Sequence, residues 1–78
     1  KEVMGPGALD PLVKELIYVA VSVVNGCQYC VHSHSAAAKK KGMTDEMRSE
    51  LFSIIAMASQ TNALAEAYQV DVDENLKA

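Results

Sequence analysis

The sequence predicts a small all-α domain, and three observations lead to that fold class. Helix start and stop signals divide the chain at short intervals. Apolar residues recur at helical spacing between those signals. No segment offers a partner for the one stretch that would also suit a β-strand, and an isolated strand leaves its backbone unpaired. We therefore expect about four helices within residues 10–70, after a flexible lead-in over residues 1–9 and before an acidic tail over residues 71–78.

The first helix is expected from about Pro11 to Val24. Asp10 can cap the free N–H groups of its first turn, and proline has the fixed φ that suits the first helical position. The valines of this segment also favour a strand, but the missing partner strand makes a helix the better interpretation. Asn25-Gly26 is a dipeptide that ends helices, so the segment stops there.

The second helix is expected to begin at Cys27 or Gln28 and to end at Gly42. Its last turn carries the basic run of residues 39–41, the only one in the chain. Cations at the end of a helix interact favourably with the negative end of its dipole. We therefore interpret the basic run as a helix terminus and not as a binding patch.

Thr44 caps the third helix, whose first turn is acidic. Its apolar stripe consists of Met47, Leu51, Ile54, Ile55 and Ala58. The polar residues 60–62 interrupt this pattern, and apolar positions resume after them. We therefore expect a break there, followed by a shorter fourth helix over about residues 63–68.

Size and charge restrict the partners of this chain. A 78-residue domain buries only about 60% of the surface that its unfolded chain exposes, yet half of these residues are apolar. We therefore expect a homo-oligomer whose copies cover one another's apolar faces. The net charge of −3 argues against nucleic-acid binding. The longest apolar run, residues 16–24, is too short to cross a bilayer, and no targeting segment is visible.

The chemistry centres on the only two cysteines, Cys27 and Cys30, and on His34. At about 100° per residue these three positions share one face of the second helix. Cα atoms three residues apart in a helix lie about 5 Å from each other, which is within reach of a disulfide. An isolated CxxC pair is typical of redox chemistry in reduced compartments, so we expect a cytoplasmic protein without a prosthetic group.

Different groups would promote ionisation of the two thiols. The positive end of the helix dipole favours a thiolate at Cys27, whereas Cys30 has the imidazole of His34 one turn further along. Glu15 is the fourth candidate, because it lies in a helix that is otherwise almost wholly apolar and could orient His34. The alternative for Glu15 is a solvated carboxylate beside Lys14.

Glu15, the twelve-residue step to Cys27, and the pattern Cys27-x-x-Cys30-x-x-x-His34 resemble the signature of the AhpD-like alkylhydroperoxidases in the carboxymuconolactone decarboxylase family. The resemblance extends over about residues 11–70 and implies an all-helical, oligomeric fold. It also implies an enzyme that reduces organic peroxides or hydrogen peroxide and that is regenerated by a dithiol or a reductase protein.

By the same resemblance, Cys30 would be the peroxidatic thiolate and Cys27 the resolving thiol. His34 would be the base, and Glu15 would complete the proton relay. Two alternatives remain. The cysteines and His34 could bind zinc in a structural module, or a decarboxylase-like reaction could proceed without the dithiol, although relatives with that activity typically lack the cysteine pair.

Overall fold

The computed structural model describes residues 2–77, which contain three α-helices and one short 3₁₀ turn and no β-strand. The elements are α1 (Pro11–Asn25), α2 (Gln28–Lys40), α3 (Asp45–Ala67) and η1 (Glu74–Leu76). The prediction of an all-α fold is confirmed. The tail that follows α3 is mostly irregular, and η1 is its only regular element in the described residues.

The capping contacts expected at the helix starts are present in the structure. The carboxylate of Asp10 accepts a hydrogen bond from the backbone N–H of Leu12 (2.9 Å) at the start of α1. At the start of α3 the hydroxyl of Thr44 accepts from the N–H of Met47 (3.1 Å). Gly26 ends α1 with a φ of 74°, a conformation that glycine adopts without steric cost.

The prediction of a break at residues 60–62 and of a separate fourth helix is wrong. Helix α3 continues through this segment to Ala67 as one element of 23 residues. The hydroxyl of Thr61 donates to the carbonyl of Met57 (3.0 Å), so its polar group is satisfied within the helix. Because this face of α3 is exposed and the segment holds no glycine or proline, polar residues do not end the helix here.

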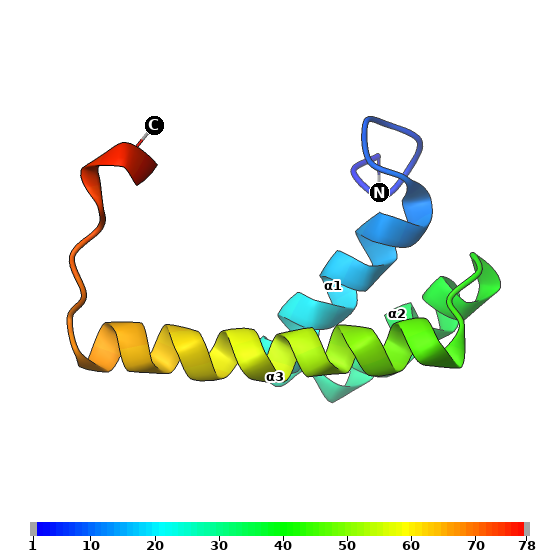
Figure 1. Ribbon diagram of the computed structural model, residues 1–78. Helices are drawn as coiled ribbons and strands as arrows, with labels where there is room; N and C mark the ends of the chain where they lie inside the picture. Colours follow the sequence, from blue (N-terminus) through cyan, green and yellow to red (C-terminus); the bar gives the residue numbers. More distant parts are fainter. Residues whose placement is uncertain (1, 78) are drawn as a thin grey trace.

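Helix α1 is the central element and packs against both α2 and α3 (Figure 1). Its buried side is unusual, because it combines apolar Val19 with polar Glu15 and Ser22. Within residues 2–77, Val19 and Ala38 are the only apolar residues that are fully buried. The carboxyl group of Glu15 therefore lies in the small core between the helices.

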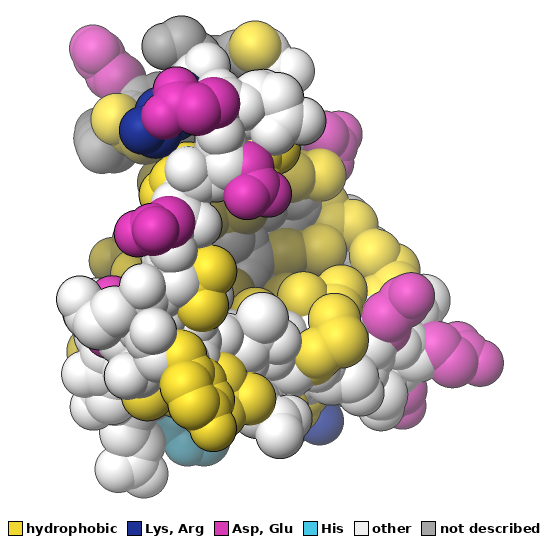
Figure 2. Space-filling model, turned by 60° about the vertical axis from the view of Figure 1, so that its left-hand side comes forward, with side chains coloured by type: hydrophobic (Ala, Val, Ile, Leu, Met, Phe, Trp, Pro, Cys, Tyr) yellow, Lys and Arg dark blue, Asp and Glu magenta, His cyan; other side chains and the backbone are white. Residues whose placement is uncertain are grey.

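Much of the apolar surface lies on α3 and the tail. The second half of α3 and the tail extend away from α1 and α2 (Figure 1), and apolar side chains surround the hollow that they border (Figure 2). The exposed large apolar residues of α3 and the tail are Ile54, Met57, Leu64, Tyr68, Val70, Val72 and Leu76, each at least 51% accessible. A single copy leaves this surface in contact with water, which is the situation expected of an oligomer subunit.

The lead-in is tied to α1 by a lysine. The ammonium of Lys14 donates to the backbone carbonyl of Val3 (2.8 Å) and to that of Gly5. These bonds turn residues 3–5 back over the first turns of α1. No helix among residues 2–77 has the length and apolar character that crossing a membrane requires.

Candidate active site

The cysteine pair opens α2. The backbone N–H of Cys27 donates to the carbonyl of Ser22 (2.9 Å), which fixes the turn between α1 and α2. Cys27 is the N-cap residue, and its Sγ accepts from the backbone N–H of Cys30 at 3.3 Å. A sulfur atom at this position lies at the positive end of the helix dipole, where a thiolate is stabilised.

Cys27 and Cys30 are joined by a disulfide, and their Cα atoms lie 5.3 Å apart. This separation agrees with the value of about 5 Å expected for two positions three residues apart on a helix. Both residues are half-buried. The pair therefore has the geometry of a dithiol that can close into a disulfide.

Glu15 is buried beneath α2, with only 4% of its side chain accessible. Its Oε1 lies 2.7 Å from Nδ1 of His34, and its Oε2 accepts from Nζ of Lys41 at 2.6 Å. The interpretation of Glu15 as a solvated carboxylate at a helix start is therefore wrong. The carboxyl group joins α1 to His34 of α2 and to Lys41, the C-cap residue of that helix.

The electrostatics of Glu15 favour the carboxylate. Burial by itself raises the pKa of Glu15, but the hydrogen bonds and positive charges of Lys41 and His34 outweigh burial and lower its pKa below the usual value. Because an ionised carboxylate only accepts hydrogen bonds, Nδ1 of His34 must carry the proton of the shared bond. In neutral His34 this leaves Nε2 unprotonated and able to accept a proton.

Tyr18 holds the imidazole plane of His34. The two rings are stacked, with centroids 3.6 Å apart and an interplanar angle of 18°. Tyr18 lies one turn after Glu15 on α1, so the same helix supplies both the hydrogen-bond partner and the stacking partner of the imidazole. Two contacts from α1, a hydrogen bond and a ring stack, therefore orient the imidazole of His34.

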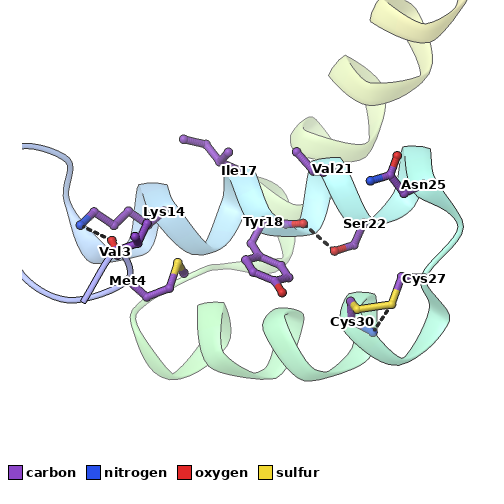
Figure 3. Close-up of a pocket in the computed structure, with 10 residues that line it drawn as sticks. All are labelled: Val3, Met4, Lys14, Ile17, Tyr18, Val21, Ser22, Asn25, Cys27 and Cys30. Carbon is purple, nitrogen blue, oxygen red and sulfur yellow. Dashed lines mark hydrogen bonds between the residues drawn. A yellow bond between two sulfur atoms is a disulfide. The ribbon is translucent and has the colours of Figure 1, made fainter. Parts of the chain in front are cut away.

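An apolar pocket of about 390 Å³ lies beside the disulfide. Figure 3 shows the cysteine pair at one end of the pocket, Met4 of the lead-in at the other, and the ring of Tyr18 between the helices. Val3, Ile17 and Val21 add further apolar walls. A small molecule with an apolar body could therefore approach the sulfur atoms from this side.

The structure thus brings the four predicted residues into two adjoining contacts, a disulfide and a carboxylate–imidazole pair. Cys30 and His34 lie one turn apart on α2. Sequence reasoning missed Tyr18 and Lys41 as members of the site. Lys41 had been interpreted only as part of a basic helix terminus, although a signal was available: positions seven residues apart lie on the same helix face, and Lys41 follows His34 by seven.

The disulfide form does not offer the cysteine pair as zinc ligands. Within residues 2–77 there is no group of three or more Cys, His, Asp and Glu side chains placed to hold a metal ion. Each sulfur is bonded to the other, and both oxygens of Glu15 already accept hydrogen bonds from cationic or imidazole groups. Zinc binds cysteine as a thiolate, so only the reduced pair could serve as its ligands.

The fold and the site define a small helical protein with a CxxC pair at a helix start and a buried Glu–His pair beside it. The sequence model of the carboxymuconolactone decarboxylase family matches residues 1–73, and the chain belongs to this family. Within the family it is AhpD-like, as its similarity to AhpD proteins shows. The family predicted from the sequence signature is therefore confirmed.

Two relatives and one solved structure illustrate the similarity. Alkyl hydroperoxide reductase AhpD of Solibacter usitatus is 35% identical over 72 residues, which are 92% of this chain and 39% of that protein. Uncharacterized protein 4 in the cox locus of Paracoccus denitrificans is 37% identical over 67 residues, 86% of this chain and 60% of that one. The crystal structure of the alkylhydroperoxidase AhpD core from Rhodospirillum rubrum has a TM-score of 0.92 and 58% identity.

The chain matches only part of each of these proteins. It covers 39% of the AhpD protein from Solibacter usitatus. The match to the Rhodospirillum rubrum core includes 96% of this chain and 56% of that chain. The similarity therefore describes the helical unit that carries the cysteine pair.

Proposed function

We propose that this chain is the redox-active unit of a thiol peroxidase that reduces organic hydroperoxides or hydrogen peroxide. The observation that supports the proposal most directly is the position of the cysteine pair at the start of α2, where His34 is one turn away and is held by buried Glu15. The names of the AhpD relatives support the same class of reaction.

In the proposed reaction, Nε2 of His34 takes the thiol proton of Cys30, and the thiolate attacks the terminal oxygen of the hydroperoxide. The S–O bond forms as the O–O bond breaks. The departing alkoxide takes the proton from the imidazolium and leaves as an alcohol, so that Cys30 becomes a sulfenic acid. Cys27 then attacks the sulfur of Cys30, which forms the disulfide and releases water.

Glu15 supports both proton transfers without touching the peroxide. Its carboxylate accepts the Nδ1–H of His34, which fixes the tautomer, and its negative charge stabilises the imidazolium formed after the first transfer. An external dithiol, either a small molecule or a reductase protein, then reduces the disulfide by thiol–disulfide exchange. The apolar pocket beside the sulfur atoms suits the hydrocarbon part of an organic hydroperoxide.

The proposal is tested by oxidising the reduced protein with one equivalent of tert-butyl hydroperoxide. We expect both thiols to disappear, the mass to fall by two hydrogen atoms, and peptide mapping to locate the bond between Cys27 and Cys30. The same protein is purified without chelator and analysed for metal. Unchanged thiol content, or zinc in equimolar amount, would contradict the proposal.

We also propose that copies of the chain associate through the exposed apolar surface of α3. Met57 is 64% exposed in the single copy, and neighbouring Ile54 is 52% exposed. Sedimentation at micromolar concentration should give a mass of at least twice the 8.4 kDa of one copy. Met57→Asp should shift the population towards the monomer because an aspartate is costly to bury.

Ser49→Asp is the control for this association, because Ser49 is an exposed polar position on the same helix. It adds the same charge outside the apolar surface and should leave the mass unchanged. A wild-type protein that sediments as a monomer at high concentration would exclude association through this surface.

A further inference from the structure

The basic run at the end of α2 contains one lysine that differs from its neighbours. The ammonium of Lys41 lies 2.6 Å from Oε2 of Glu15. Within residues 2–77, neither Lys39 nor Lys40 forms an ion pair. A role in stabilising the helix end would apply to all three residues alike. The contact with a buried carboxylate is specific to Lys41.

Lys41 and His34 each contact one carboxylate oxygen of Glu15, and both approach it from the side of α2. Their positions are two turns apart on the same face of α2, and their distances to the carboxylate are nearly equal, at 2.6 and 2.7 Å. The side chain of Lys41 is 38% exposed, so the lysine keeps contact with water while its ammonium neutralises a carboxylate that is only 4% accessible. The ammonium thus reduces the cost of keeping Glu15 charged in the core.

We infer that Lys41 is a positioning residue of the proposed thiol site, an inference that rests on the proposed function. It keeps Glu15 ionised and so fixes His34 as the tautomer with a free Nε2. Without the ammonium, a buried Glu15 would take up a proton more readily. A neutral carboxyl group can donate to Nδ1, and the imidazole would then carry its proton on Nε2, where it could no longer accept one from the thiol.

The direction of the pH effect follows from the groups that face Glu15. These are Lys41 and His34 from α2, with Tyr18 of α1 stacked on the imidazole. Among the described residues, no side chain of α3 forms a hydrogen bond with this carboxylate. Lys41 lowers the pKa of Glu15, so its removal raises that pKa and the carboxylate is lost at a higher pH.

The experiment compares Lys41→Met with Lys41→Arg and with Lys40→Met. Lys41→Met removes the charge and keeps an apolar stem, Lys41→Arg retains the charge, and Lys40→Met removes a charge from the same helix end without touching Glu15. The carboxyl titration of Glu15 and the tautomer of His34 are measured by NMR on the disulfide form, so neither readout depends on peroxide chemistry. The rate of oxidation by tert-butyl hydroperoxide is then measured on the reduced proteins at pH 6 and pH 8.

For Lys41→Met we expect a raised pKa of Glu15 and a mixed His34 tautomer. We also expect an oxidation rate that falls about fivefold at pH 6 and stays within about twofold of wild type at pH 8. Lys41→Arg should restore wild-type values, and Lys40→Met should match wild type throughout. Lys41→Gln keeps a donor without a charge, and it replaces Lys41→Met in the same measurements if the methionine variant does not fold.

The inference is overturned if the Glu15 titration and the His34 tautomer are the same in wild type and in the uncharged variants. It is also overturned if both change while the oxidation rates at the two pH values do not. A wild-type protein that peroxide fails to oxidise overturns the proposed function instead. The NMR readouts on the disulfide form distinguish these two failures.

Discussion

Cys30→Ser should lower the rate of peroxide-dependent oxidation by about a thousandfold or more. A serine hydroxyl is not ionised near neutral pH and is a weak nucleophile without a strong base, so the S–O bond of the first step cannot form. The measurement is the consumption of tert-butyl hydroperoxide by the reduced protein, followed together with its thiol content. This is the largest effect expected of any single substitution in the chain.

Cys27→Ser is the matched control, because it removes the other sulfur and leaves His34 next to the remaining thiol. This variant should consume one equivalent of peroxide and stop at a sulfenic acid, which a sulfenic-acid-specific reagent would trap. The reverse pattern, in which Cys30→Ser consumes one equivalent and stops at a sulfenic acid while Cys27→Ser is inert, would contradict this assignment and exchange the two roles. The comparison is informative because Cys27, at the N-cap, is also in a position that stabilises a thiolate.

His34→Gln should lower the oxidation rate by about a hundredfold at pH 7, the range typical of a lost general base. Glutamine keeps a polar group within reach of Glu15 but cannot take a proton from the thiol. The rate should also approach that of wild type as the pH rises, because the thiolate then forms without help. Second-order rate constants from pH 6 to pH 9 measure both effects.

His32→Gln is the control for this substitution. His32 lies on the same helix but is exposed, and within residues 2–77 it forms no hydrogen bond through its side chain. Its replacement should leave the rate profile unchanged. Equal losses in the two variants would show that the effect comes from the helix as a whole and not from the imidazole of His34.

The part of the site that lies within one helix could be predicted from the sequence. The spacing of Cys27, Cys30 and His34 fixes their relative positions as soon as the segment is helical, because helix geometry varies little. The start of that helix followed from local signals as well, since Asn25-Gly26 ends the preceding one. These features depend on neighbours in the sequence and do not need tertiary structure.

The contacts between helices could be predicted only in part. Glu15 was identified as a candidate, but its burial depends on how closely α1 and α2 pack, which spacing does not determine. The sequence pattern indicated only a helix-terminus role for Lys41, because its partner carboxylate lies on another helix. The helix break predicted at residues 60–62 was wrong for a related reason. Polar residues are compatible with a helix wherever its face is exposed, and exposure depends on the tertiary structure.

The hydrogen bond from the amide of Cys30 to Sγ of Cys27 would couple the proposed redox change of the pair to the backbone of α2. The acceptor of this bond changes from a bridged sulfur to a free thiol or thiolate each time the pair is reduced, and a charged acceptor strengthens the bond. In the proposed cycle, the strength of this hydrogen bond in the first turn of α2 would therefore change with each oxidation and reduction of the pair. The chemical shift of that single amide proton is an intrinsic reporter of the fraction of molecules in each state, with no added label.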